Sequence, residues 1–342
     1  MKTYKLTYLL LAAFLLTVAC SKTEAGRGPV DGRLIGFNTV NSTSTKAASA
    51  YPTTQPFITQ AYKLVSGKTW DANKAEAGSP FIDEKEVTYD ATYNYWKTAD
   101  NYYWPSDGST LTFFSYSPAS LKGKVSVSIE GVSIPSWDVK TDAGDILVAD
   151  IAKDKSKNEG YAGYTGVPTL FRQKLARIAF RFGVASDAAE GTQVKLTGIS
   201  LRDVYSSGTY AKGGYGDDDW TPSSINSSSW ALVSSEMVLS KGSLVEGSSL
   251  EFNMIPQRLV SSISPAAHPI LEISYSLRTN GGSTWEPKTA SCYFDENLRQ
   301  ESWEKGKKYT YTIYIGVGQY PIDFDANVSE WGTIGDGSVD IG

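Results

Sequence analysis

Residues 176–184, ARIAFRFGV, decide the fold class of this chain. Apolar side chains occupy every second position from Ile178 to Val184, and Arg181 and Gly183 lie among the residues between them. A two-residue period of this kind is typical of a β-strand that turns one face toward a core. The segment therefore predicts a half-buried strand.

The same two-residue period recurs along the rest of the chain, and no segment of comparable length shows the 3.6-residue period of a helix. Glycine and proline clusters, such as Pro105 to Gly108 and the pair Gly281-Gly282, separate the apolar runs where strands must reverse. These signals predict an all-β protein built from antiparallel sandwiches. Further strands are expected at 125–129, 271–277, 309–315 and 322–328.

The composition indicates a folded protein and excludes several classes of function. The 342 residues are 41% hydrophobic and 20% charged, which is enough apolar material for a packed core. A net charge of −5 lacks the basic excess of a nucleic-acid binder. With one histidine, His268, in a proline-bounded turn, and two cysteines, zinc fingers, disulfide scaffolds and most catalytic triads are excluded. We expect no enzyme activity, no catalytic residue, no metal and no cofactor.

The front of the chain has the pattern of an export signal. Lys2 and Lys5 precede an apolar run from Leu9 to Val18, which is too short to span a bilayer comfortably. The residues Thr-Val-Ala-Cys that end at Cys20 resemble the lipobox of bacterial lipoproteins, which implies acylation of Cys20 and anchoring in the outer membrane. The alternative is an unmodified Cys20 in a plain signal peptide or in a single membrane anchor.

Composition also divides the chain. Residues 150–166 are charged and rich in glycine, show no alternation, and indicate a boundary between two domains. A second polar tract, 206–229, indicates a long surface excursion. The expected segments are a lipoprotein signal peptide at 1–19, a tether at 20–32, an N-terminal β-sandwich domain at 33–165 and a C-terminal β-sandwich domain at 166–342.

Six segments form an ordered set of motifs. They are Leu34–Phe37 with Thr45–Ala47, Asn101–Pro118, Asp145–Ala149 with Val167–Phe182, Val194–Tyr210, Trp303–Tyr311 and Phe324–Trp331. In this order, and behind a lipobox, they resemble the fimbrillins of the Bacteroidetes, which include minor-fimbria-like lipoproteins and the subunits of type V pili. Gln173 stands where that family commonly has a histidine, which argues against a catalytic histidine.

The resemblance implies two transthyretin-like β-sandwich domains in tandem and assembly with other fimbrial subunits at the cell surface. It also implies that a trypsin-like protease removes the first strand by cutting after a basic residue. Here that residue is Lys46, followed by Ala47, whereas the family almost always has arginine. Host or bacterial surface molecules are expected as further ligands, and nucleic acid is not.

The residues themselves explain how a single strand could join one subunit to another. Residues 34–40 are expected to form a short strand, and one cut in the polar run that follows would leave an open sheet edge. A terminal strand of another subunit could fill that edge. The alternative is that both terminal strands stay in their own sandwiches. The exchange candidates are Leu34, Ile35, Phe37 and Val40 in the first strand, and Ile322, Phe324, Ala326, Val328 and Trp331 near the end.

A rival hypothesis is a monomeric outer-membrane lipoprotein that binds glycans. Aromatic side chains between residues 93 and 104 could stack on sugars, although such clusters are more often core. The acidic run 217–219 fits no calcium loop and indicates a solvated turn. The aromatic cluster comprises Tyr93, Tyr95, Trp96, Tyr102, Tyr103 and Trp104.

Overall fold

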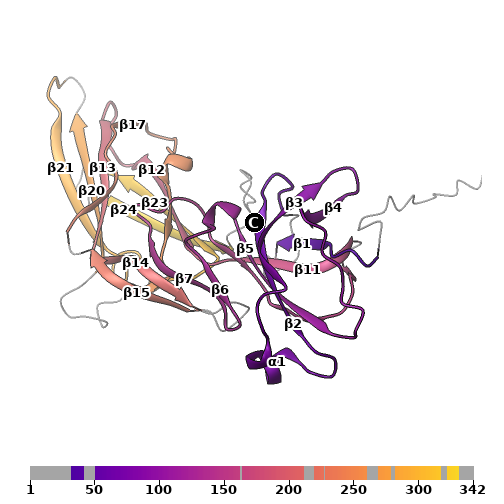
Figure 1. Ribbon diagram of the computed structural model, residues 1–342. Coiled ribbons are helices and arrows are strands. Elements are labelled where there is room, and N and C mark those ends of the chain that lie inside the picture. Colours follow the sequence, from indigo (N-terminus) through magenta and orange to yellow (C-terminus); the bar gives the residue numbers. More distant parts are fainter. Residues whose placement is uncertain are drawn as a thin grey trace, which may run out of the picture.

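The protein is all-β and elongated. The computed structural model describes residues 32–41, 51–161, 164–211, 219–226, 228–259, 269–278, 282–316 and 322–330. Figure 1 shows strands β1 to β5 with β11 toward one end of the molecule, and β13, β20 and β21 at the other. The described part contains one short α-helix, α1 (Trp70–Asn73), and three 3-10 segments, Lys74–Glu76, Ala119–Leu121 and Ser248–Leu250.

The first sheet closes on itself. Its strand order is β1-β4-β3-β2-β5-β8-β11-β10, with β9 on β5, and β1 also pairs with β11, so the path returns to its start. Strand β1 is therefore the element that closes the ring. The strands are β1 (Phe37–Asn41), β2 (Phe57–Leu64), β3 (Ile82–Asp90), β4 (Tyr95–Thr98), β5 (Thr110–Ser117), β8 (Leu147–Ala149), β9 (Ala152–Lys155), β10 (Glu159–Tyr161) and β11 (Tyr164–Gln173).

Two sheets pack face to face at the other end of the molecule. Ile178, Phe180 and Phe182 of β12 share one core with Leu271 and Ile273 of β20, as the alternation predicts. One sheet has the order β18-β12-β23-β24, and the other has β16-β13-β20-β21 with β17 on β13. The strands are β12 (Ala176–Val184), β13 (Gln193–Arg202), β16 (Trp230–Val233), β17 (Met237–Leu239), β18 (Glu251–Met254), β20 (Ile270–Arg278), β21 (Glu286–Tyr293), β23 (Lys307–Ile315) and β24 (Ile322–Glu330).

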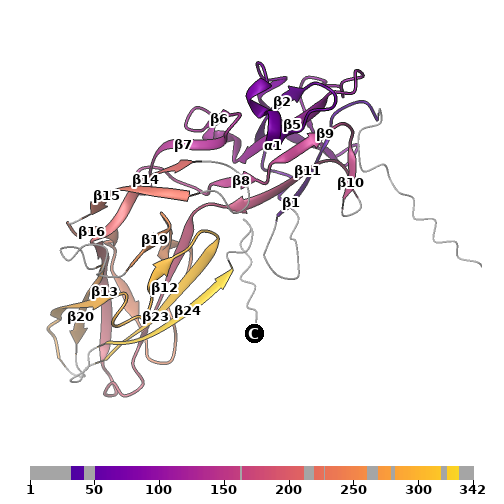
Figure 2. The same ribbon diagram turned by 90° about the horizontal axis from the view of Figure 1, so that it is seen from below.

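A further sheet joins the two ends (Figure 2). Its order is β15-β14-β7-β6, so a strand pair from beyond residue 200 extends a hairpin from before residue 140. Trp137 and Tyr210 from this sheet share a core with Ile58 and Phe114 of the first sheet. The strands are β6 (Ser126–Ser128), β7 (Gly131–Asp138), β14 (Val204–Ala211) and β15 (Asp219–Asn226), and β19 (Gln257–Arg258) pairs separately with β22 (Ser302–Trp303).

Several expectations need correction. The tract 150–166 contains β9, β10 and the start of β11, and the tract 206–229 contains most of β14 and all of β15, where strands were not expected. The sheets are not wholly antiparallel, because β1 pairs with β11 and β12 pairs with β23 in parallel. Alternation gives the face of a strand but not its direction, and these partners are more than 120 residues apart.

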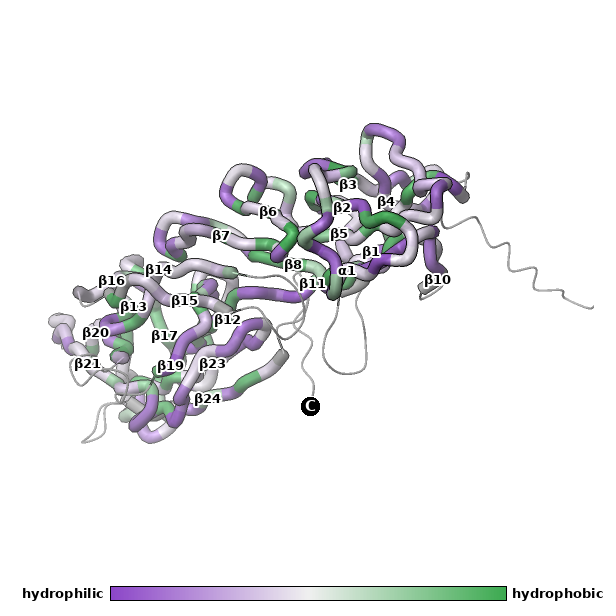
Figure 3. The backbone as a smooth tube through the Cα atoms, turned by 60° about the horizontal axis from the view of Figure 1, so that its bottom comes forward, coloured by the Kyte–Doolittle hydropathy of each residue, from purple (hydrophilic) through white to green (hydrophobic). Residues whose placement is uncertain are grey.

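The predicted division at 165/166 falls inside a strand. Strand β11 belongs to the first sheet and β12 to a second one, and only Lys174 and Leu175 lie between them. In Figure 3 short apolar and polar stretches alternate along the strands of both ends. In the part of the chain that the structure describes, no helix is long and apolar enough to cross a membrane.

Candidate assembly site at the first strand

Strand β1 is bonded along both of its edges. On one side, residues 37–41 pair in parallel with residues 167–171 of β11. On the other side Phe37 pairs with Trp96 of β4, and the segment just before β1 bonds to the chain at 102–104. There the Ile35 N–H donates to the Tyr102 carbonyl at 2.8 Å, and the Trp104 N–H donates to the Arg33 carbonyl at 2.9 Å. Removal of this segment would open the ring between β4 and β11.

The side chains of this segment belong to the core inside the ring. Ile35 is 2% exposed and Phe37 is 1% exposed. The Phe37 ring lies 5.8 Å from the rings of Phe57 and Phe113, nearly perpendicular to both, which is a favourable edge-to-face arrangement. Burial of two such side chains stabilises the fold by roughly 3 to 6 kcal/mol. Loss of the strand would leave two apolar cavities side by side.

Gly166 lets the backbone of this segment approach closely. A Cβ atom at Gly166 would lie 2.7 Å from the Phe37 carbonyl carbon and 2.9 Å from the Asn38 nitrogen. Only glycine avoids that collision, because both atoms belong to the backbone and cannot swing aside. The site therefore fits a strand backbone closely at this point.

The other two predicted exchange residues of the first strand are Leu34 and Val40, for which the structure gives mainly the backbone pairing. Leu34 is half-buried and forms an isolated bridge with Tyr103. Val40 pairs with Leu170 in the parallel ladder. The predicted lipid site Cys20 and the predicted cut site at Lys46 and Ala47 lie outside the described residues.

Strand β24 is an edge strand bonded only to β23 among the described strands (Figure 2). Its register pairs Ile322 with Ile315 and Phe324 with Ile313. Residues 325–329 are all exposed, and Val328 is 49% exposed. The prediction of a half-buried strand is therefore wrong for Ala326 and Val328, because no element of the described chain covers them. Trp331 lies outside the described residues.

The aromatic cluster of the glycan hypothesis is mostly core. Tyr95, Trp96 and Trp104 are buried, and the two tryptophans belong to the same core as Phe37. Tyr93 and Tyr103 are the exposed members, at 46% and 48%. His268, Asp217 and Asp218 lie outside the described residues. Within the described ranges, no three histidine, cysteine, aspartate or glutamate side chains are grouped as a metal site would require.

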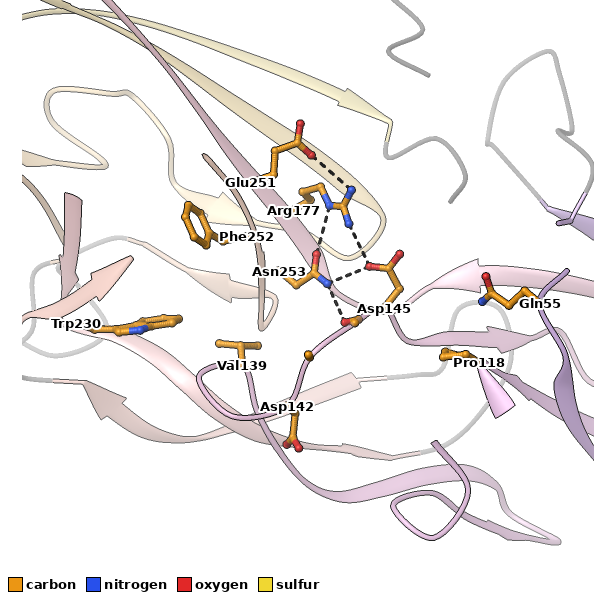
Figure 4. Close-up of a pocket in the computed structure, with 12 residues that line it drawn as sticks. Gln55, Pro118, Val139, Asp142, Asp145, Arg177, Trp230, Glu251, Phe252 and Asn253 are labelled. Carbon is orange, nitrogen blue, oxygen red and sulfur yellow. Dashed lines mark hydrogen bonds and ion pairs between the residues drawn. The ribbon is translucent and has the colours of Figure 1, made fainter. Parts of the chain in front are cut away.

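Sequence reasoning did not find a cleft of about 590 Å³ near the junction of β11 and β12 (Figure 4). Val139, Trp230 and Phe252 form its apolar wall. Among the polar lining residues, Arg177 of β12 contacts Asp145 at 3.3 Å, and the Asn253 amide donates to Asp145 at 2.9 Å. These bonds tie the segment before β8 to β12 and β18. Their donors and acceptors are far apart in the sequence, so no local motif marks them.

The comparisons with known proteins agree with this architecture. The model of the family described as fimbrillin-like matches residues 61–331, most of the chain. The chain belongs to the fimbrillin-like family. The match confirms the resemblance seen in the ordered motifs.

Individual relatives of this fimbrillin-like chain are more distant. The fimbrium subunit Fim1C of Phocaeicola vulgatus is 23% identical over 97% of this chain and 98% of its own length. A solved fimbrial protein from Bacteroides vulgatus shares its fold with a TM-score of 0.58 at 19% identity, covering 88% of this chain and all of that one. A Parabacteroides distasonis structure, provisionally described as a cell adhesion protein, gives a TM-score of 0.52 at 13% identity, covering 90% and 100%.

Proposed function

We propose that this protein is a non-catalytic structural or adhesive subunit of a cell-surface fimbria, joined to other subunits by strand exchange. The observation that carries the proposal is the position of β1, which comes first in the described chain and closes a sheet by bonding on both sides. A closing strand that can be cut free leaves a long open edge with an apolar slot. Its family membership supports the same role.

The donor in this proposal is β24 of another subunit. Ile35 and Phe37 are separated by one residue, and Ile322 and Phe324 repeat that spacing. Placed in the vacated groove, Ile322 would take the cavity of Ile35 and Phe324 that of Phe37. The exposure of residues 325–329 and the edge position of β24 favour a strand that can leave its own sheet.

Export and maturation complete the proposal. Residues 1–19 direct secretion, Cys20 carries the lipid, residues 20–32 act as a tether on the outer membrane, and a cut between Lys46 and Ala47 frees the first strand. The two ends of the molecule then correspond to two transthyretin-like β-sandwich domains in tandem. A junction at Lys174 and Leu175 suits the two sheets better than one at 165/166, because β11 stays whole.

The test is the intact mass and N-terminal residue of the protein recovered from the native cell envelope. We expect a chain that starts at Ala47, carries no lipid, and occurs in multimers that resist detergent. The variant Lys46→Ala should retain the first strand and remain monomeric, whereas Lys157→Ala, an exposed lysine elsewhere, should mature normally. A wild-type chain found only as a lipidated monomer starting at Cys20 would refute the proposal and favour the glycan-binding alternative.

A further inference from the structure

The parallel ladder between β1 and β11 ends abruptly. It runs from the pair Phe37–Val167 to the pair Asn41–Phe171. The residues of β11 that precede Val167 pair with β10: Gly166 pairs with Glu159, and Thr165 pairs with Gly160. The segment 34–36 therefore continues past the end of its parallel partner. Its backbone groups on that side need other hydrogen-bond partners.

The side chain of Asn158 supplies them. Its Oδ1 accepts from the Gly36 N–H at 3.1 Å, and its Nδ2 donates to the Leu34 carbonyl at 2.7 Å and, more weakly, to the Gly32 carbonyl at 3.4 Å. A carboxamide offers both a carbonyl acceptor and N–H donors, as a peptide group does. One side chain thus bonds to the two backbone groups that flank Ile35.

These bonds reproduce a missing step of the ladder. In a parallel ladder a residue donates to the carbonyl before its partner and accepts from the N–H after it. Val167 follows this rule, because its N–H donates to the Gly36 carbonyl at 2.7 Å opposite Phe37. By the same register, Thr165 would bond to Leu34 and Gly36. Asn158 makes both bonds in its place.

The surroundings of Asn158 hold it in position. It is half-buried and directly precedes β10, whose pairing with β11 fixes the backbone. Lys155 and Glu159 form an ion pair of 3.0 Å across the same turn. The Asn158 amide and Gly166 therefore contact the same stretch of the front segment, one through hydrogen bonds and the other through close packing.

We propose that Asn158 is a positioning residue that retains the front strand before exchange and bonds to the backbone of the strand that replaces it. This inference rests on the proposed strand exchange. The incoming occupant is an extended segment of a second copy, residues 322–328. Because Asn158 bonds only backbone groups, it accepts any residue in the place of Gly36 except proline, which lacks the N–H. The side-chain cavities of Ile35 and Phe37 then select for apolar residues.

The experiment measures release of the front segment. The full chain is prepared with Cys20→Ser and with a recognition site for a specific protease in residues 42–46, and release is followed by mass spectrometry after the cut. Loss of the hydrogen bonds to Leu34 and Gly36, with the weaker one to Gly32, should speed release from Asn158→Ala about 30-fold. Lys157→Ala, an exposed neighbour in the same turn, should match the parent chain. Equal release rates for Asn158→Ala and the parent would overturn the inference.

Two further measurements keep the result decisive. Asn158→Asp has the same shape and retains the acceptor but loses the donor, so its release rate should fall between the other two even if Asn158→Ala folds poorly. After release, a synthetic peptide of residues 322–330 should bind the emptied Asn158→Ala chain about 30-fold more weakly than the emptied parent. Equal affinities would contradict the role in binding the incoming strand.

The outcome also separates this inference from the proposed function. Faster release from Asn158→Ala, in a parent chain that never forms multimers, would support retention by Asn158 and refute strand exchange. Multimers of the parent chain combined with equal release rates would support strand exchange and refute the role of Asn158. Hydrogen exchange at the amides of residues 35 and 36 in the uncut chain supplies a readout that depends neither on release nor on multimers. This exchange should be faster in Asn158→Ala than in the parent chain, and unchanged in Lys157→Ala.

Discussion

Phe37 is a large, fully buried side chain of the first strand. Its ring fills a site between Phe57 and Phe113. Phe37→Ala should lower the free energy of unfolding of the uncut chain by about 3 to 5 kcal/mol, because a large cavity opens in the core. Denaturant unfolding measures this. Tyr93→Ala removes a ring that is half exposed, and it should cost less than about 1 kcal/mol; equal losses for the two variants would contradict the assignment.

The reactivity of Cys292 in β21 tests whether the core shared by β12 and β20 is closed to solvent. Its thiol is buried in the core between β12 and β20, and burial raises its pKa to about 12. In the Cys20→Ser chain, a thiol reagent at pH 8 should therefore label the native protein at least about 100-fold more slowly than the unfolded protein. Rapid stoichiometric labelling of the native chain would contradict this placement.

The same pKa shift predicts how stability depends on pH. An unfolded thiol has a pKa near 8.5, below the value in the folded state. The folded state therefore holds the thiol proton more tightly than the unfolded state does. The resulting contribution to the free energy of unfolding is complete below pH about 8 and is lost as pH rises toward 12. Relative to Cys292→Ala, the parent chain should lose stability more steeply above pH 9 in thermal unfolding.

The sequence predicts apolar core residues more readily than polar positioning residues. Ile35 and Phe37 follow from alternation, because burial of every second side chain leaves a periodic pattern. Asn158 leaves no such pattern. Its role arises where two strands end at different points, and only the register of β10 and β11 reveals that gap. Gly166 is also recognised only once the Phe37 backbone is seen beside it.

At the scale of elements, the pairing of β1 with β11 depends on close approach at Gly166. Gly166→Ala should push the two strands apart, because the new Cβ would meet the Phe37 and Asn38 backbone. We expect hydrogen exchange at residues 37–41 to increase at least about tenfold, while β20 stays protected. Gly78→Ala meets nothing within 4 Å and should leave exchange in β1 unchanged. Unchanged exchange in both variants would show that the strands can separate without loss of pairing.

The elements that were predicted correctly are those with one face in a core. Strands β20 and β23 alternate between buried and partly exposed residues along almost their whole length, whereas β12 is buried everywhere except at Arg177 and Arg181. Strands β9 and β10 are short and charged, so their sequence resembles a linker. Parallel pairing also escaped prediction, because it depends on which distant strands become neighbours rather than on the period within either one.

At the scale of the whole molecule, the fold class and the family follow from the sequence, and the way the ends are joined does not. Alternation gives an all-β protein, and the ordered motifs give the fimbrillin-like family. The connection between the ends depends on β14 pairing with β7, and on Arg177 and Asn253 bonding to Asp145 beside the cleft. Each of these contacts joins residues at least 32 positions apart, so local patterns carry no trace of them.

The last strand tests whether assembly and monomer stability are separate properties. Residues 325–329 of β24 are exposed, so deletion of 322–342 removes few buried side chains from that part of the strand. The truncated monomer should fold with a melting temperature lowered by no more than about 5 °C. Multimers should be lost completely, because the proposed donor is gone. Deletion of 331–342 alone, which keeps β24, should retain multimers that are weakened only by the loss of Trp331. Normal multimers from the longer deletion would show that the donor lies elsewhere, whereas an unfolded monomer would show that β24 is needed by its own sheet and cannot be spared for exchange.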